Sequence, residues 1–506
     1  MHTVKTINRK MLMIYMAFII SICIIVIGKL IYLMVYKSEY YGAKALEIQE
    51  RERKIKAPRG EILDRNGKVI ASNKTVCTIS VIYNQVKETE KVIEILAKEL
   101  EMTDKEVRKK VTKRSSREKI KSNVPKEKGD AIRNYNLSGV KVDEDYKRYY
   151  PYSSLASKVL GFTGADNQGI IGLEIKYDKY LKGTDGLILT PTDSRGVEQE
   201  KALEQRVEPV SGNSLTTSID VNIQKYSEQI AYNALKAKQA NYVSIIVMNP
   251  NNGEILAMVN APEFDLNNPY ELSDELLTLF STYMTDTNQA RVRENDNYEN
   301  FAEMIYNYNE IKENYETDSE EYQNAYMELL YTLWRNKAVS ELYEPGSTFK
   351  IITTSMAFEE NVITPNTVFT CYDPYSVEGT KIHCHKRGGH GTHEYSYMLQ
   401  QSCNPTLIQV AQLVGNEKFY QYFEAYGYTS KTGIDLPAEA SPIFHNYSGF
   451  NSVELATYSF GQTFKITPIQ QITAVSTVAN GGYLLTPHVV SRITDNDGNV
   501  VYSADE

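Results

Sequence analysis

The sequence predicts a multidomain α+β protein that is held to a membrane by an N-terminal helix. The chain has 506 residues, which is too long for one hydrophobic core. An apolar segment occupies residues 11–36. Beyond it, segments with the alternation of strands are interspersed with segments that have the spacing of helices. The net charge of -9 argues against nucleic acid as the main partner.

The apolar segment, residues 11–36, contains a single lysine among its hydrophobic residues. A run of this length can cross a bilayer core of about 30 Å as one helix. Lys5, Arg9 and Lys10 precede it, which predicts that residues 1–10 stay in the cytoplasm and the remainder lies outside. A cleaved signal peptide is the alternative, but its apolar region would be shorter. We therefore expect an uncleaved, single-pass anchor.

Residues 37–210 combine strand and helix patterns. Glu47–Lys56 is charged and helix-prone, and we expect it to continue the membrane helix outward. Asp64–Gly67 has turn chemistry, since Asn-Gly suits a tight hairpin, and Val76–Tyr83 alternates as a strand does. Lys87–Arg114 is rich in lysine and glutamate with apolar residues at helical spacing, which predicts one or two amphipathic helices.

Residues 211–506 form the second large region. A strand is predicted to lead into a helix capped near Asp220. Two apolar runs, Asn241–Met248 and Glu254–Val259, flank a turn and predict a hairpin. Residues 271–333 are acidic and rich in tyrosine, and we interpret them as an inserted helical segment that faces solvent rather than a partner.

The segment Glu344–Lys350 carries a pair of residues suited to covalent catalysis. Ser347 and Lys350 are three positions apart after a Pro-Gly break, so both would lie on one face of a helix that starts there. A neutral lysine can take the proton of a serine hydroxyl and turn it into a nucleophile. A second motif, Ser402-Cys403-Asn404, follows downstream. The alternative role of Ser347 is an ordinary helix N-cap.

These segments together resemble class B penicillin-binding proteins, which are membrane-anchored peptidoglycan transpeptidases. The resemblance covers most of the chain, and it implies a pedestal (dimerisation-type) domain at 37–210 and a transpeptidase domain at 211–506, whose antiparallel sheet is flanked by helices. Ser402-Cys403-Asn404 and His390-Gly391 are most similar to the cell-division and sporulation branch. The other matching segments are Arg59–Gly67, Gly172–Gly186, Leu215–Gln224 and Gly253–Met258.

The resemblance implies acyl transfer on peptidoglycan stem peptides that end in D-alanyl-D-alanine. Ser347 would attack the peptide carbonyl with Lys350 as its base, and β-lactams would acylate the same serine. Ser402 would relay a proton to the leaving amine, and Asn404 would bond the substrate amide or Lys350. No cofactor is needed for this catalysis, and membrane proteins of cell-wall synthesis are the expected partners. A catalytically impaired scaffold and a D,D-carboxypeptidase are the alternative functions.

The family's third motif, Lys-Thr/Ser-Gly on a strand, is the point at which the sequence departs from the pattern. Lys431-Thr432-Gly433 has the triplet, but its surroundings resemble a different family segment, so we interpret it as a coincidental match. Residues 461–487 normally precede the third motif, and the sequence ends at Glu506 before one appears. That strand supplies an oxyanion donor, and losing one donor typically costs ~10²–10³ in rate. We therefore expect this chain to be inactive or strongly impaired on its own.

Three of the five cysteines and four of the seven histidines lie between residues 371 and 403. Thiolates and imidazoles are the ligands that Zn²⁺ prefers. Three interpretations remain open: a structural zinc site, a disulfide between Cys384 and Cys403, or free thiols. The zinc site would use some of the residues Cys371, Cys384, His390, His393 and Cys403.

Overall fold

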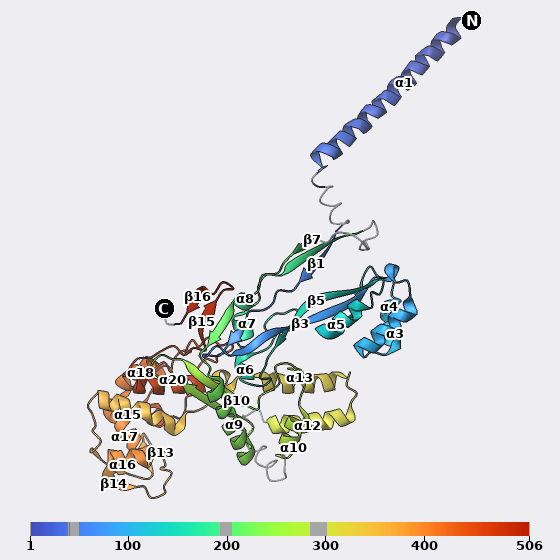
Figure 1. Cartoon of the computed structure of the whole chain (residues 1–506). Coiled ribbons are helices and arrows are strands. Elements are labelled where there is room, and N and C mark those ends of the chain that lie inside the picture. The colour runs from blue at the N-terminus through green and yellow to red at the C-terminus, as the bar shows by residue number, and fades with distance from the viewer. Residues whose placement is uncertain (1, 39, 41–49, 193–204, 284–300, 505–506) are drawn as a thin grey trace. The chain divides into compact units, whose positions relative to one another are not determined.

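The structure is a computed structural model that describes residues 2–38, 40, 50–192, 205–283 and 301–504 (Figure 1). Its contacts divide the chain into two compact units. The first unit comprises residues 1–57, 75–146 and 184–210, and the second unit comprises residues 58–74, 147–183 and 211–506.

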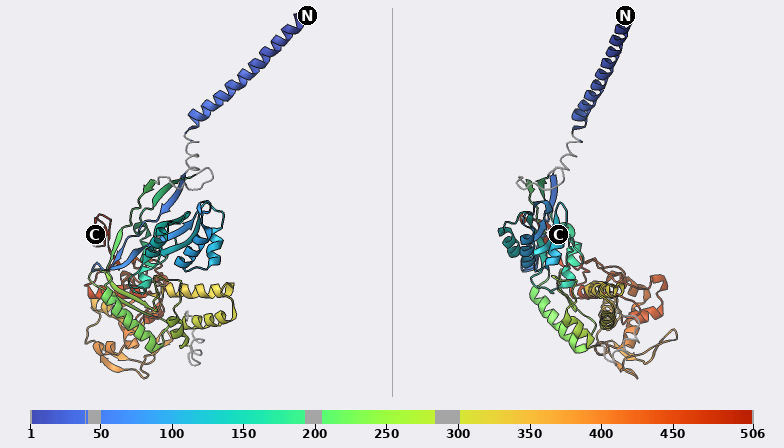
Figure 2. Two further views of the ribbon diagram at one scale, coloured as in Figure 1. Left: turned by 45° about the vertical axis from the view of Figure 1, so that its right-hand side comes forward. Right: turned by 90° about the vertical axis from the view of Figure 1, so that its right-hand side faces the viewer.

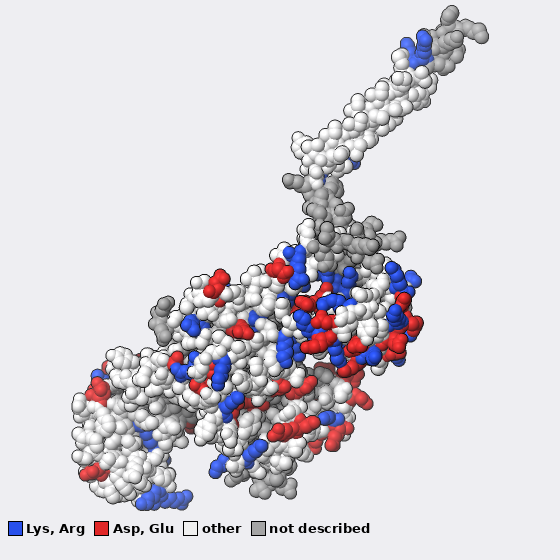
Figure 3. Space-filling view, viewed as in Figure 1, with Lys and Arg blue, Asp and Glu red and all other residues white. Residues whose placement is uncertain are grey.

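The first unit begins with a long apolar helix. Helix α1 (His2–Ile31) continues into a π-helical turn at Tyr32–Tyr36. In the described part of the chain, Arg9–Tyr36 is the one helical stretch long and apolar enough to cross a membrane. Figure 3 shows this helix as a largely uncharged surface. The helix coincides with the anchor predicted at residues 11–36.

A small sheet follows, and it corrects one prediction. The expected helix at Glu47–Lys56 is wrong where the structure describes it, because Glu50–Ile55 form strand β1. This strand pairs antiparallel with β6 (Gly186–Pro191), which also pairs with β7 (Gln205–Val207). Pairing with residues far along the chain therefore overrides local helix propensity. Residues 47–49 lie outside the described residues.

The lysine- and glutamate-rich segment forms two helices, as predicted. Helices α3 (Thr89–Leu100) and α4 (Asp104–Val111) bury their apolar faces in a core of their own. Thr103 and Glu106 form a capping box that fixes the start of α4. The core is completed by α5 (Lys126–Asn134), β4 (Glu118–Pro125), β5 (Val140–Tyr149) and the later residues of β3 (Val69–Val81).

The second unit contains a sheet with strand order β16-β15-β8-β2-β3. The predicted turn joins β2 to β3, and the Asp64 carboxylate accepts hydrogen bonds from the N–H groups of Asn66 and Lys68. The remaining strands and the short helices beside them are β2 (Ile62–Leu63), β8 (Ser214–Thr217), β15 (Val490–Thr494), β16 (Val500–Ser503), α6 (Ser157–Leu160), α7 (Gly172–Lys176) and α8 (Asp178–Leu181).

The predicted helix and hairpin after β8 are both present. Asp220 caps α9 (Val221–Lys238) by accepting from the N–H groups of Asn222 and Ile223. Strands β9 (Val243–Met248) and β10 (Ile255–Ala261) pair antiparallel. Helix α9 runs along this hairpin (Figures 1 and 2) and packs Ala231 against it.

The segment expected to be a solvent-facing insertion is helical, but its apolar face is part of the main core. Helices α12 (Phe301–Asn314) and α13 (Glu320–Trp334) lie side by side (Figure 2), and α10 (Asp274–Ser281) packs beside α12. Phe280 and Ile305 are fully buried in that core. These amphipathic helices therefore face solvent on one side, as expected, but their other side is part of the core, which was not expected. Residues 284–300 of this segment lie outside the described residues.

The rest of the second unit is mainly helical and has a second, aromatic core around Phe349 and Phe423. Its strands form two short antiparallel pairs, β11 with β14 and β12 with β13. The elements are α14 (Lys337–Ser340), α15 (Lys350–Glu359), β11 (Val368–Cys371), β12 (Tyr375–Val377), β13 (Thr380–Ile382), β14 (Gly391–Glu394), α16 (Tyr395–Gln400), α17 (Asn404–Val414), α18 (Asn416–Ala425), α19 (Ser452–Tyr458) and α20 (Pro468–Ala479). The predicted multidomain α+β fold is confirmed.

Candidate active site

The turn that carries Ser347 is fixed by a close backbone contact between Gly346 and Gly461. Residues Gly346–Phe349 form a 3₁₀ turn, and α15 begins at Lys350. The Gly346 N–H donates to the Gly461 carbonyl at 2.8 Å. A Cβ atom on Gly461 would come within 2.2 Å of the Gly346 oxygen. Gly461 was not among the predicted site residues, because its close approach to Gly346 arises only in the folded chain.

Phe349 anchors the turn between the two predicted catalytic residues. Its ring is fully buried, and the centroids of four aromatic rings lie 5.0–6.3 Å from its own. Those rings belong to Phe419, Phe423, Tyr428 and Phe464. Ser347 remains exposed while Lys350 is buried. The turn therefore presents a serine hydroxyl to solvent above a buried amine.

Lys350 is surrounded by neutral oxygen atoms. Its Nζ donates to the Ser402 carbonyl and hydroxyl, each at 2.8 Å, and to Asn404 Oδ1 at 2.7 Å. These acceptors satisfy all the N–H donors of an ammonium group. Burial lowers the pKa of Lys350 to about 8, although the nearby Cys403 and Cys384 act to raise it. An amine with this pKa can lose its proton near neutral pH.

Ser402 connects the buried amine to the exposed serine. Its hydroxyl donates to Ser347 Oγ at 3.0 Å and accepts from Lys350 Nζ at 2.8 Å. Its φ of 51° is left-handed, and Asn404 then opens α17. Helix α15 has no side-chain cap, so the N-cap alternative for Ser347 is wrong. The structure brings all four predicted catalytic residues together, and Asn404 contacts Lys350.

Lys431-Thr432-Gly433 lies in a loop rather than in a strand. The backbone N–H and hydroxyl of Thr432 donate to Glu439 Oε1 at 2.7 Å, and the Gly433 N–H donates to the other oxygen. This loop position agrees with the interpretation of the triplet as a coincidental match. The expectation of impaired activity stays a prediction.

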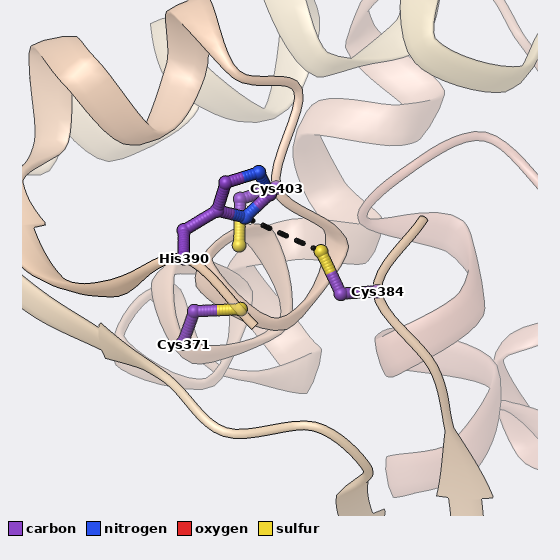
Figure 4. A group of neighbouring side chains, drawn as sticks. All are labelled: Cys371, Cys384, His390 and Cys403. Carbon is purple, nitrogen blue, oxygen red and sulfur yellow. Dashed lines mark hydrogen bonds between the residues drawn. The ribbon is translucent and has the colours of Figure 1, made fainter. Parts of the chain in front are cut away.

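The cysteine- and histidine-rich region folds into a compact group beside the site. One ligand atom from each of four residues lies within 4.8 Å of all the others, and these residues are Cys371, Cys384, His390 and Cys403. Their side chains point toward one another (Figure 4). All five cysteines of the chain are described, and none forms a disulfide.

His393, the fifth candidate ligand, is not a member of this group. It lies on the exposed strand β14, and its ring centroid is 4.3 Å from that of Tyr397. His390 precedes β14 whereas His393 lies within it, so the two imidazoles leave the backbone from different elements.

Comparison with known proteins agrees with this architecture. Residues 243–505 match the penicillin binding protein transpeptidase domain, and residues 54–217 match the penicillin-binding protein dimerisation domain. The chain therefore belongs to the penicillin-binding protein family.

Two curated relatives show where in the family the similarity is high. Stage V sporulation protein D of Bacillus subtilis is 34% identical over 491 residues, covering 96% of this chain and 67% of the relative. Peptidoglycan D,D-transpeptidase MrdA of Acinetobacter baumannii is 25% identical over 511 residues, covering 93% and 68%. The chain thus spans about two thirds of the length of each of these relatives.

Solved structures support the fold. Penicillin Binding Protein 2X from Streptococcus thermophilus superposes with a TM-score of 0.65 at 20% identity, covering 90% of this chain and 64% of that one. A peptidoglycan synthetase from Bifidobacterium adolescentis gives a TM-score of 0.61 at 22% identity, covering 89% and 77%.

Proposed function

We propose that this chain is a peptidoglycan D,D-transpeptidase that forms a covalent acyl-enzyme at Ser347. The observation that carries the proposal is the hydrogen-bonded series from Lys350 through Ser402 to Ser347. It joins an exposed hydroxyl to a buried amine of lowered pKa, which is the arrangement that nucleophilic catalysis requires. The transpeptidase domain match supports the same reaction.

In the first half-reaction, Ser347 Oγ attacks the carbonyl carbon of the penultimate D-alanine of a stem peptide. Once Lys350 is neutral, both hydroxyls rotate so that Ser347 donates to Ser402 and Ser402 donates to the amine; the Ser347 proton then moves to Ser402, and the Ser402 proton moves to Lys350. The same path then returns a proton to the leaving nitrogen, so the C–N bond breaks and D-alanine departs as a neutral amine. An ester between Ser347 and the donor peptide remains.

In the second half-reaction, an amine from a neighbouring stem peptide attacks the ester carbonyl. Its proton leaves through Ser402 and Lys350, and Ser347 Oγ is released with a proton. A new amide bond forms, which is the crosslink. A β-lactam would acylate Ser347 in the same way, but its opened ring stays attached to the acyl group instead of diffusing away.

The chain is a membrane-anchored protein, and we propose that Arg9–Tyr36 crosses the membrane once. Residues 1–10 would stay in the cytoplasm, because basic residues flank the apolar run on that side. The active site would then lie outside, where peptidoglycan is built. Membrane proteins of cell-wall synthesis are the partners that we propose for this anchored form, in division or in sporulation.

The proposal is tested by incubating the purified chain with lipid-linked peptidoglycan precursor that has been polymerised into glycan strands. We expect crosslinked stem dimers from the wild-type chain, at the strongly reduced rate predicted above, and none from Ser347→Ala. Trimmed monomers without dimers would instead identify a D,D-carboxypeptidase. Neither product, in a chain that is folded by circular dichroism, would contradict the proposed activity and favour a scaffold.

A further inference from the structure

We propose that Cys371, Cys384, His390 and Cys403 bind one Zn²⁺ ion, and that this ion holds the Ser402–Asn404 segment in its active geometry. The zinc site is independent of the reaction that the enzyme performs. The role of the ion in positioning rests on the proposed function, since it concerns the residues that bond Lys350.

The spacing of the four side chains suits a tetrahedral ion. Zn–S bonds of about 2.3 Å and a Zn–N bond of about 2.0 Å place tetrahedral ligand atoms about 3.5–3.8 Å apart. The Cys384 sulfur lies 3.4 Å from His390 Nδ1, and all four ligand atoms lie within 4.8 Å of one another. Shortening the longer distances between ligand atoms by a few tenths of an ångström to about 1 Å would therefore give the spacing of a tetrahedral zinc site.

The group is closed to solvent, as structural zinc sites are. The exposed fractions are 5% for Cys371, 5% for Cys384, 7% for His390 and 0% for Cys403. Three sulfurs and one imidazole leave no open position for water or substrate, which separates this site from a catalytic zinc. Soft thiolate ligands in a tetrahedral set select zinc over magnesium or calcium.

Strand pairing and backbone hydrogen bonds shape the chain around the group. The register of β11 and β14 sets Cys371 opposite Gly391, next to His390. The Asp373 carboxylate accepts from the N–H groups of Cys384 and Gly388, at 3.1 and 2.8 Å, and so orders the loop between them. A Cβ on Gly389 would lie 2.4 Å from the Cys371 oxygen, so a side chain at this position would push the loop away from Cys371.

Cys403 has a hydrogen-bond partner outside the group. The Thr406 hydroxyl donates to its sulfur at 3.3 Å from the first turn of α17. Such outer partners orient metal ligands and are part of well-formed sites.

One ligand is flanked by two residues of the candidate active site. Cys403 stands between Ser402 and Asn404, which supply all three acceptors of the Lys350 amine. Ser402 adopts a left-handed conformation that a non-glycine residue rarely takes unless its surroundings impose it. An ion bound to Cys403 would tie the backbone of residues 402–404 to Cys371 in β11 and to Cys384, which follows β13.

The first experiment measures zinc and free thiols in the full-length protein, purified in detergent with its thiols protected. We expect one zinc per chain and no disulfide. Cys384→Ser and His390→Ala should lose most of the metal, while His393→Ala and Cys77→Ser, which alter a neighbouring histidine and a buried cysteine outside the group, should keep it. A zinc-free protein with a Cys384–Cys403 disulfide, or with five free thiols, would overturn the proposal.

The second experiment uses the wild-type chain, so that a variant that fails to fold cannot obscure the result. A chelator should lower the melting temperature, and added Zn²⁺ should restore it. Replacement by Co²⁺ should give the absorption of a tetrahedral thiolate complex, most of which should be lost in His390→Ala.

The positioning role is read from penicillin acylation of Ser347 in chelated protein that is still folded by circular dichroism. We expect the rate to fall about 10-fold or more and to recover with Zn²⁺. One bound zinc with an unchanged rate after its removal would overturn the positioning role. Absence of acylation both with and without zinc would contradict the proposed function and also the positioning role, but not the metal site.

Discussion

Two buried cationic centres in the second unit behave differently because only one of them faces a carboxylate. Arg59 and Arg148 both donate to Glu174, whose side chain is fully buried. Burial lowers the pKa of Arg59, but the charge of Glu174 and the hydrogen bond to it, together with those of Asp178, outweigh that effect and raise the pKa above its ordinary value. Lys350 is also buried, yet the three oxygens that it contacts are neutral, and its pKa falls to about 8.

The comparison shows that the partner of a buried cation decides whether the cation stabilises the fold or can take part in proton transfer. A carboxylate partner holds the proton on the base and ties together segments of the fold. Neutral hydrogen-bond acceptors orient the amine and still allow it to lose the proton. The first arrangement stabilises the protein, and the second suits it to proton transfer.

The largest expected effect comes from removing the Lys350 amine, which has no carboxylate partner among its hydrogen-bond acceptors. Lys350→Met should lower the rate of penicillin acylation at Ser347 by ~10²–10⁴, which is the usual contribution of a general base. The melting temperature should change little, because no buried carboxylate is left without its partner. Intact-protein mass spectrometry over time measures the rate, with Ser347→Ala as the unlabelled control. Labelling of Lys350→Met at the wild-type rate would show that another group takes the proton.

A substitution at Glu174, the partner of the two buried arginines, should lower stability and leave the acylation rate unchanged. Glu174→Gln removes the buried carboxylate that Arg59 and Arg148 share and leaves Arg59 paired with Asp178 alone, so it should cost ~3–5 kcal/mol of unfolding free energy. Fluorescence of the single tryptophan, Trp334, which lies in the core of the second unit, reports the urea transition. The acylation rate of the folded fraction should remain that of the wild type.

Glu90→Gln is the matched control, because it removes a carboxylate from an exposed pair with Arg108. Exposed ion pairs contribute little to stability, so its urea midpoint should equal that of the wild type. Equal effects of the two substitutions would contradict the assignment of Glu174 as a stabilising partner.

A substitution at Asn404 would convert the neutral surroundings of the amine into charged ones. Asn404→Asp places a carboxylate where Oδ1 now lies 2.7 Å from Lys350 Nζ. A carboxylate this close should raise the pKa of Lys350 by about 1–3 units. Since the neutral amine is the active form, the rise of acylation rate with pH should move upward by the same amount. Asn404→Ala, which removes the hydrogen bond without adding charge, should show no such upward movement.

Much of this site could be predicted from local sequence because its parts have short-range signatures. Ser347 and Lys350 are one helical turn apart, and Ser402 and Asn404 flank a single residue, so the spacing alone indicates which side chains can act together. The helices at residues 87–114, the cap at Asp220 and the hairpin of β9 and β10 were predicted for the same reason. Each is specified by residues close together in the chain.

The features that were missed depend on contacts between distant residues. Strand β1 is a strand because β6 lies beside it, and the apolar faces of the helices within residues 271–333 are buried because the main core accepts them. The pairing of Arg59 with Glu174 spans 115 positions, and the close approach of Gly461 to Gly346 depends on the tertiary fold. The cysteine cluster was predicted as a region, but only the fold separates His390 from His393.

The most direct test of the central claim is the pH dependence of Ser347 acylation in the wild-type chain. A lysine of lowered pKa is neutral above that pKa, so the rate should rise with pH through about 8 and level off above it. The measurement uses labelled penicillin between about pH 6 and 10, corrected for loss of the probe, with the labelled peptide identified by mass spectrometry. A rate that is independent of pH across this range, or label on a residue other than Ser347, would contradict a buried lysine base that acts through Ser402.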